Sequence, residues 1–292
     1  MRVRKAVFPA AGWGTRFLPA TKAQPKEMLP LVDKPIIQYG VEEAVAAGIE
    51  QIIIVTSTHK GAIEDHFDLN YELEHLLEEK GEIEKLRQIR AITDLAQLAY
   101  VRQKEQLGLG HAVLMAKDLI GHEPFAVILP DDVCIGDRPV IGQLIHAYHQ
   151  THGSVVAVME VPPEETSRYG VIASEPTEDP LDHGRLHRVT RLVEKPAPKD
   201  APSNLGIIGR YVLTPKIFDK LEQTQRGAGG EIQLTDAIQA LMEEQQVFAY
   251  AFEGVRYDAG TTMGWLKASV ELALQRPELG PEFRAYLNSI QP

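Results

Sequence analysis

Short runs of apolar, mostly β-branched residues recur along the chain, and segments with helical spacing lie between them. The runs are apolar without alternation, which is typical of strands buried on both faces, as in a parallel sheet covered by helices. These runs are residues 6–8, 52–55, 125–129 and 155–158. The segments expected to form crossover helices are residues 36–47, 110–120 and 140–151. The alternation predicts a three-layer α/β/α fold with a mainly parallel central sheet.

Two regions depart from this alternation. Residues 62–95 are rich in Glu, Leu, Lys and Ile at helical spacing and predict an inserted pair of helices. We expect a break near Gly81, because glycine disfavours a helix interior. Residues 162–204 combine prolines and charges with a strand pattern over 187–193, which suits an antiparallel addition to the main sheet.

The chain shows no internal repeat and no low-complexity linker, so we expect residues 1–292 to form one domain with a helical tail over about 262–292. The composition is 44% hydrophobic and 24% charged, which excludes a disordered chain. The formal net charge of −11 argues against a nucleic-acid partner, because phosphate backbones favour basic surfaces.

Three further features bear on compartment and partners. No apolar run is long enough to span a bilayer, so no membrane partner is expected. The N-terminal segment runs directly into a glycine turn and lacks the pattern of a signal peptide. Cys134 is the single cysteine, which excludes an internal disulfide and a cysteine-based zinc cluster. These features predict a cytoplasmic protein.

The segment after the first predicted strand has the composition of a phosphate-binding loop. Residues 10–30 read AAGWGTRFLPATKAQPKEMLP. Glycines let backbone N–H groups approach a phosphate or a base without a Cβ in the way. Arg16 and Lys26 supply cations that can offset charge developing at phosphorus. Glycines alone would indicate only a tight turn, but together with these cations they favour phosphate handling.

Two familiar phosphate motifs are incomplete in this segment. The dinucleotide fingerprint needs a third glycine, but Phe17 stands in that position after Gly12 and Gly14. The Gly-Lys-Ser/Thr ending of a P-loop occurs nowhere in the chain. A dehydrogenase of the Rossmann type is therefore a weak alternative.

The motif GxGTRFLPATKxxPKEMLP resembles the signature of the sugar-1-phosphate nucleotidyltransferases. It is similar in particular to the signature of bacterial members that use UTP and glucose 1-phosphate. Further segments resemble motifs of that family in the family's order: residues 103–112, 130–133, 169–171, 193–196, 206–211, 230–236 and 257–261. The resemblance reaches about residue 275. It implies a Rossmann-like nucleotidyltransferase fold. It also implies an enzyme that converts UTP and glucose 1-phosphate into UDP-glucose and pyrophosphate.

Two aspartates are candidate metal ligands. Asp131 follows the strand predicted over 125–129, and ligands of open α/β sheets gather at the carboxyl ends of strands. Carboxylate oxygens there suit Mg²⁺, and Asp258, after the apolar stretch 247–252, can supply another oxygen. The resemblance assigns Asp131 and Asp258 as the Mg²⁺ ligands. Asp132 either contacts the ribose or sugar or helps to orient the site.

The resemblance also places the nucleotide. Its binding residues would be Ala10, Ala11, Gly12, Gly14, Thr15, Gln103, Gly108 and Asp132. The amide of Gln103 carries a donor and an acceptor together and so suits a uracil edge. Gly108 would allow the backbone to approach the base closely.

The resemblance assigns binding of the sugar phosphate to a second group of residues. Glu194 would bind the glucose hydroxyls and Lys195 the phosphate, with Gly170 and Gly209 allowing close backbone approach to the sugar. Adjacent residues on an extended strand point to opposite faces, so Glu194 and Lys195 need not pair with each other.

The expected mechanism is in-line attack of the sugar-phosphate oxygen on the α-phosphorus. Arg16 and Lys26, the proposed catalytic residues, would act by position and charge. A glucose-1-phosphate thymidylyltransferase or another relative is the alternative within the family. A non-catalytic protein that senses nucleotide sugars is the alternative outside the enzymes. The resemblance also implies a homo-oligomer, either dimer or tetramer.

Overall fold

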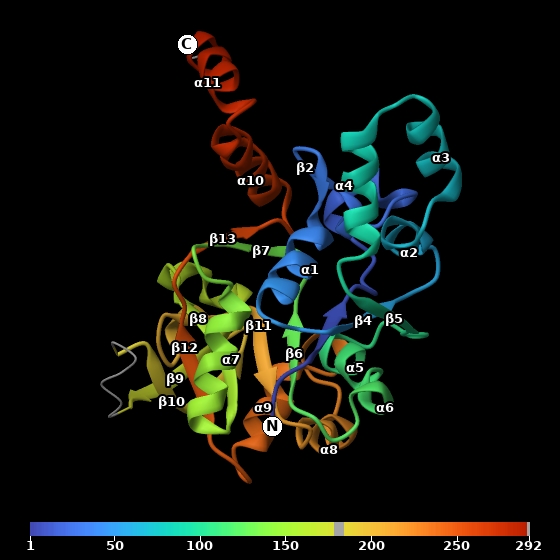
Figure 1. Ribbon diagram of the computed structural model, residues 1–292. Helices are drawn as coiled ribbons and strands as arrows, with labels where there is room; N and C mark the ends of the chain where they lie inside the picture. The colour runs from blue at the N-terminus through green and yellow to red at the C-terminus, as the bar shows by residue number, and fades with distance from the viewer. Residues whose placement is uncertain (178–183, 291–292) are drawn as a thin grey trace.

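A central nine-stranded sheet organises the protein in the computed structural model, which describes residues 1–177 and 184–290 (Figure 1). Its strand order is β5-β4-β1-β6-β11-β8-β12-β10-β9. The bounds are β1 Lys5–Pro9, β4 Gln51–Thr56, β5 Gln97–Arg102, β6 Phe125–Ile128, β8 Ser154–Glu160, β9 Gly170–Pro176, β10 Leu186–Glu194, β11 Leu205–Leu213 and β12 Val247–Ala251. The strands predicted over 6–8, 52–55, 125–129, 155–158 and 187–193 are all present.

The sheet is mixed in direction. Strands β5, β4, β1 and β6 are parallel to one another, and β8 is parallel to β12. Strand β10 runs antiparallel to β12 and β9, as expected of an antiparallel addition at the edge. Strand β11 runs antiparallel between β6 and β8, inside the sheet. Burial on both faces produces the same apolar pattern for either strand direction, so the sequence did not reveal this reversal.

Helices cover both faces of the sheet, which confirms the three-layer α/β prediction. Helices α1 (Ile36–Ala46), α2 (Gly61–Phe67) and α7 (Val140–Thr151) pack on the face that includes Phe8. The opposite face, which includes Val7, is covered by α5, α6, α8 and α9. The bounds of these helices are α5 Leu109–Leu114, α6 Lys117–Ile120, α8 Ile217–Gln223 and α9 Leu234–Leu241. The helix predicted over 110–120 is therefore divided into α5 and α6.

The helical insertion contains one more helix than predicted. After α2, α3 (Tyr71–Glu79) and α4 (Ile83–Thr93) follow, with the predicted break at Gly81, where φ is 69°. The additional break precedes α3, whose first turn is capped by Asn70: its side-chain oxygen accepts a hydrogen bond from the Leu73 backbone N–H at 3.0 Å. Asparagine at an N-cap satisfies an otherwise unpaired donor and favours a helix start there.

The tail consists of α10 (Thr262–Gln275) and α11 (Gly280–Ser289), which extend away from the sheet in Figure 1. The last two residues of the predicted tail lie outside the described part of the chain. No described helix combines the length and apolar character that a membrane crossing requires. The single-domain organisation stays a prediction.

Two short antiparallel pairs stand outside the main sheet. Strand β2 (Pro30–Leu31) pairs with β3 (Lys34–Pro35), and β7 (Asp132–Ile135) pairs with β13 (Val255–Asp258). The β7–β13 register sets Asp132 opposite Asp258. This pairing joins the end of β6 to a segment far along the chain.

A buried ion pair connects the sheet to helix α1. Arg210 on β11 is fully buried, and its Nε and Nη2 donate hydrogen bonds to the Glu43 carboxylate at distances from 2.7 to 3.1 Å. Glu43 Oε1 also accepts a hydrogen bond at 2.8 Å from the backbone N–H of Ile141, in the first turn of α7. One carboxylate therefore joins α1, α7 and β11.

The same guanidinium holds the turn after β6. Arg210 Nη1 donates to the carbonyl oxygens of Leu129 at 3.2 Å and Gly209 at 2.9 Å, and Nη2 donates to that of Asp132 at 2.7 Å. A buried charge is tolerated only when it is paired and hydrogen-bonded. Because these partners include both ends of the segment 129–132, Arg210 fixes the backbone on either side of Asp131.

We expect Glu43→Gln to lower the free energy of unfolding by about 3 kcal/mol, because removing one partner of a buried pair leaves the other charge uncompensated. Urea denaturation of the two proteins measures this difference. Glu84→Gln is the matched control, since Glu84 pairs with Arg87 on an exposed surface and little change is expected there. Equal stability of Glu43→Gln and the unchanged protein would contradict the role given to the buried pair.

Candidate functional site

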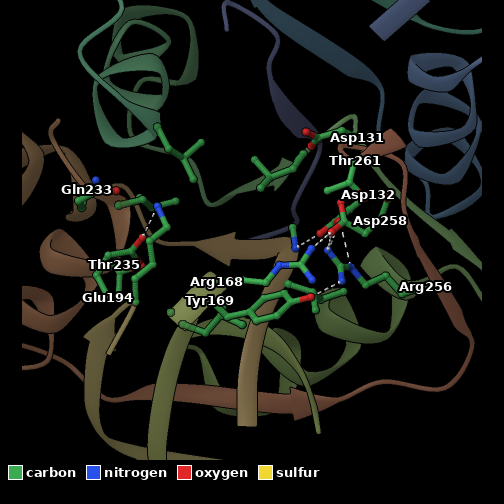
Figure 2. Close-up of a pocket in the computed structure, with 18 of the residues that line it drawn as sticks. Asp131, Asp132, Arg168, Tyr169, Glu194, Gln233, Thr235, Arg256, Asp258 and Thr261 are labelled. Atoms are coloured by element: carbon green, nitrogen blue, oxygen red, sulfur yellow. Dashed lines mark hydrogen bonds and ion pairs between the residues drawn. The ribbon is translucent and has the colours of Figure 1, made fainter. Parts of the chain in front are cut away.

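A cavity of about 730 Å³ lies beside the carboxyl end of β6 and is lined by residues from widely separated segments (Figure 2). The residues predicted from the sequence that line it are Arg16, Asp131, Asp132, Gly170, Glu194, Lys195, Gly209 and Asp258. The predicted metal ligands and the predicted sugar-phosphate residues therefore share one cavity. Lys26 joins them through its contact with Asp131.

The carboxylates of Asp131 and Asp258 converge beside Gly260. A Cβ atom on Gly260 would lie 2.8 Å from Asp131 Oδ2 and 3.2 Å from Asp258 Oδ1. Any larger residue would push against both oxygens. The β7–β13 pairing brings the two aspartates together, because Asp131 directly precedes β7 and Asp258 ends β13.

Each of the two carboxylates has a cationic neighbour from another element. Lys26 Nζ lies 2.5 Å from Asp131 Oδ2, and Arg168 Nη2 lies 2.9 Å from Asp258 Oδ2. Arg16 Nη1 donates to the Gly260 carbonyl oxygen at 3.4 Å. The cations of the glycine-rich loop therefore face the aspartates, as the sequence hypothesis requires.

The charge state of the Lys26–Asp131 pair follows from this contact. Burial alone would raise the pKa of Asp131, but the Lys26 ammonium and its hydrogen bond outweigh burial and hold that pKa below its usual range. Burial likewise opposes the charge of Lys26, but Asp131 and Glu27 raise its pKa above the ordinary value. Both groups are therefore charged at neutral pH.

A second, more deeply buried pair supports the loop that carries Lys26. Lys60 Nζ lies 3.0 Å from Glu27 Oε1 and 2.8 Å from Oε2. Burial raises the pKa of Glu27 and lowers that of Lys60, and their mutual attraction opposes both shifts. Because Glu27 is the next residue after Lys26, this pair anchors the Lys26 backbone to the segment before α2.

Asp132 is engaged by protein groups on both of its oxygens. Oδ2 accepts a hydrogen bond from Gly209 N at 2.7 Å, and Oδ1 accepts one from Arg256 Nε at 2.9 Å. Burial raises the pKa of this carboxyl, while Arg256 opposes the rise. The geometry favours the orienting role considered for Asp132, and its direct contact with a nucleotide stays a prediction.

Arg168, Tyr169 and Arg256 form a wall of the cavity that was given no role from the sequence. Arg256 Nη1 donates to the Tyr169 hydroxyl at 3.1 Å, and its guanidinium lies 5.4 Å from the centre of the tyrosine ring. Alternation within β13 could have identified Arg256, because residues two apart on a strand share a face and Asp258 is two positions later. Other unassigned lining residues include Tyr211, Gln233, Thr235 and Thr261.

Glu194 and Lys195 meet each other, a contact that the alternation of an extended strand does not require. Lys195 Nζ lies 3.2 Å from Glu194 Oε1, and both residues line the cavity. Lys195 has a φ of 44°, so the chain turns at this residue instead of continuing as a strand. The alternation rule fails here because it holds only for extended backbone.

Gln103 and Gly108 are joined to each other but do not line this cavity. Gln103 Nε2 donates to the Gly108 carbonyl oxygen at 3.2 Å, and the Gln103 backbone N–H donates to Thr56 O at 2.9 Å. The latter bond places Gln103 at the carboxyl edge of the sheet. Gly108 has a φ of 99°, and a Cβ there would lie 2.6 Å from Glu231 Cβ. Packing against Glu231 is thus sufficient to explain this glycine.

The remaining predicted nucleotide residues lie along the loop after β1. Ala10 and Ala11 are buried, and the Ala11 carbonyl oxygen accepts a hydrogen bond from Ser57 Oγ at 3.1 Å. Gly12 and Thr15 are exposed, and Gly14 adopts a φ of 67° before the short helix that begins at Thr15. Their contact with a nucleotide stays a prediction.

The donor set of the cavity restricts the kind of metal ion it could hold. Within the described residues, no group of three or more His, Cys, Asp or Glu side chains is arranged to hold a metal. Asp131 and Asp258 offer only oxygen ligands. Mg²⁺ fits such a site, because it prefers oxygen, keeps several waters and usually takes one or two carboxylates together with substrate phosphates.

The sequence matches the family described as nucleotidyl transferase over residues 5–275. Two similar curated proteins are UTP–glucose-1-phosphate uridylyltransferases. The protein of Staphylococcus epidermidis is 56% identical over 290 residues, covering 99% of both chains. That of Bacillus subtilis is also 56% identical over 290 residues, covering 99% of this chain and 97% of the relative.

Solved structures agree with this similarity. A UDP-glucose pyrophosphorylase complexed with UDP-glucose is 48% identical, with a TM-score of 0.85, and the match covers 94% of this chain and 100% of the other. A UTP-bound UGPase from Acinetobacter baumannii is 43% identical, with a TM-score of 0.90, and covers 99% of this chain and 100% of the other.

The left-handed backbone at Lys195 generates a stability prediction. We expect Lys195→Gly to be at least as stable as the unchanged protein, because glycine adopts this conformation without strain. Lys195→Val should be less stable by about 1–2 kcal/mol, since a β-branched residue resists it. Urea denaturation compares the two, with Lys199→Val on the neighbouring exposed turn as control. A Lys195→Val protein as stable as Lys195→Gly would show that no strain is held at this position.

Proposed function

The chain belongs to the nucleotidyl transferase family, and on that premise we propose that it transfers the uridylyl group of UTP to glucose 1-phosphate. The products are UDP-glucose and pyrophosphate. One observation carries the proposal: the carboxylates of Asp131 and Asp258 converge in a cavity that also holds Arg16 and Lys195. Paired carboxylates beside cations suit a reaction between two phosphate esters. The choice of UTP and glucose 1-phosphate as substrates follows from the names of the similar proteins.

We assign Asp131 and Asp258 as the residues that hold Mg²⁺. An ion held there would supply positive charge to offset that of the phosphates. The requirement for glycine at position 260 supports the assignment, because a side chain would occupy the space that the two carboxylate oxygens face. Asp132 stays bound to Gly209 and Arg256 and keeps the neighbouring Asp131 in place.

The chief electrostatic obstacle is the approach of two anions. Unit charges about 4 Å apart repel by about 4 kcal/mol at an effective dielectric constant near 20. Arg16 and Lys26 offset this repulsion on the nucleotide side, and Lys195 does so on the side of the sugar phosphate. The attacking phosphate oxygen is already ionised at neutral pH, so no residue has to remove a proton from it.

Orientation is the second contribution of the protein. Glu194 offers carboxylate oxygens to the sugar hydroxyls, while the adjacent Lys195 ammonium meets the phosphate of the same substrate. Their 3.2 Å contact keeps these two groups together at one end of the cavity. Holding both esters in line for attack on the α-phosphorus converts an encounter in solution into a step within one complex.

The loop of residues 10–15 and the Gln103–Gly108 segment complete the nucleotide site in this proposal. Both follow strands of the parallel half of the sheet, β1 and β5, and so lie at its carboxyl edge. Ligands of open α/β sheets bind at this edge. Cytoplasmic location and a dimeric or tetrameric assembly complete the proposal as expectations from the sequence.

A product assay tests the function. The purified protein is incubated with Mg²⁺, each of UTP, dTTP, CTP and ATP, and several sugar 1-phosphates, and pyrophosphate and nucleotide sugar are measured. We expect UTP with glucose 1-phosphate to react fastest and EDTA to abolish turnover. Some use of dTTP is expected, because one methyl group is discriminated only about 10–200-fold. No pyrophosphate release from UTP and glucose 1-phosphate would refute the proposal.

Gly260→Ala tests the metal assignment. The added methyl group would lie within 3.2 Å of both carboxylate oxygens and force them apart. We expect the Mg²⁺ concentration for half-maximal activity to rise by about tenfold to a hundredfold, with a reduced kcat and a retained fold. Gly61→Ala is the control, because a Cβ there would meet no atom within 4 Å. An unaltered Mg²⁺ dependence would remove the assignment of this pair.

A further inference from the structure

The side-chain amide of Gln103 is held in one orientation. Its Nε2 donates one hydrogen bond to the Gly108 carbonyl oxygen at 3.2 Å and lies 2.9 Å from His111 Nδ1. A carbonyl oxygen can only accept, so the amide atom facing Gly108 must be the nitrogen. The two contacts therefore use both N–H groups of the amide.

His111 is suited to accept the second of these bonds. Burial lowers the pKa of His111, against smaller opposing effects from Glu105, so the ring is neutral at neutral pH. A neutral imidazole carries one N–H and one acceptor nitrogen. Because Gln103 Nε2 faces Nδ1, the acceptor is Nδ1 and the proton is on Nε2.

The amide oxygen of Gln103 is left for another partner. No described residue donates a hydrogen bond to Oε1, and this oxygen is not among the fully buried side-chain atoms without a partner. Gln103 is nevertheless only 4% exposed, so its side chain has little freedom to turn. The structure thus presents an acceptor, and no donor, at this position.

The position of this acceptor suits a base. Gln103 follows β5, and the Ala10–Gly12 loop follows β1, with β4 between them. These segments are separated by two strand spacings, a distance of about 10 Å. This distance leaves room for a pyrimidine ring that is hydrogen-bonded on both sides. Ser57, directly after β4, donates a hydrogen bond to the Ala11 carbonyl oxygen and keeps that loop at the same edge.

We propose that His111 is a positioning residue for base selection, which fixes the Gln103 amide so that Oε1 accepts the imino N3–H of the base. Uracil and thymine carry this N–H, whereas cytosine presents a lone pair at N3. With cytosine, the Gln103 oxygen would therefore face the lone pair of N3, and two acceptors repel each other. Turning the amide to present its nitrogen would break the bonds to Gly108 and His111. This inference rests on the proposed function, because it concerns recognition of the same nucleotide.

The experiment measures kcat/KM for UTP, CTP and dTTP with glucose 1-phosphate and Mg²⁺, in the full-length protein and its variants. In His111→Ala we expect the preference for UTP over CTP to fall about five- to tenfold, the effect of one hydrogen bond. The change should appear mainly in KM. The ratio of UTP to dTTP should not change, because both bases carry the N3–H.

Three further variants distinguish a positioning role of His111 from a merely structural one. His111→Asn places an amide oxygen near the former Nδ1 position and should restore the preference for UTP over CTP. His111→Leu removes the acceptor while filling space, so it replaces His111→Ala if that protein is insoluble. His146→Ala, on an exposed position of α7, should leave every ratio unchanged.

The outcomes distinguish this inference from the function on which it rests. If His111→Ala and His111→Leu lower activity with UTP and CTP by the same factor, the positioning role is overturned and a merely structural one remains. Failure of His111→Asn to restore the ratio also overturns it. Absence of turnover with UTP in the unchanged protein would instead refute the proposed function.

Discussion

The fully buried guanidinium of Arg210 imposes the constraint from which the site follows. A charge without water must find an opposite charge and an acceptor for its N–H groups, and Glu43 with three backbone carbonyl oxygens meets that need. Two of those carbonyl oxygens belong to Leu129 and Asp132, on either side of Asp131. The position of Asp131 is therefore set from the core of the protein, through the backbone on either side of it.

Charge compensation continues outward from this core toward the cavity. Asp132 is bound by Arg256, Asp131 by Lys26, and Asp258 by Arg168. Each carboxylate thus faces a cation from a different element. A site built of such alternating charges can exchange one set of partners for phosphate groups and a metal ion without leaving a charge uncompensated. That property suits a reaction in which two anions meet and a third leaves.

Much of the fold was readable because buried strands and crossover helices impose strong apolar patterns. The sequence also placed Asp131 correctly at a strand end, since a strand ends where its apolar run ends. It did not reveal that β11 runs antiparallel inside the sheet, because burial on both faces looks the same in either direction. Nor did it reveal the β7–β13 pair, because these two short strands are far apart along the chain and meet only in the folded protein.

The sequence by itself determined the α/β layers, the glycine-rich loop with its cations, and the residue types that the chemistry needs. Local patterns suffice for these because they depend on neighbours along the chain. Tertiary structure alone decided which groups meet: the convergence of Asp131 and Asp258 beside Gly260, and the left-handed turn that joins Lys195 to Glu194. It also decided the direction of the Gln103 amide, since a side chain takes its orientation from partners that packing supplies.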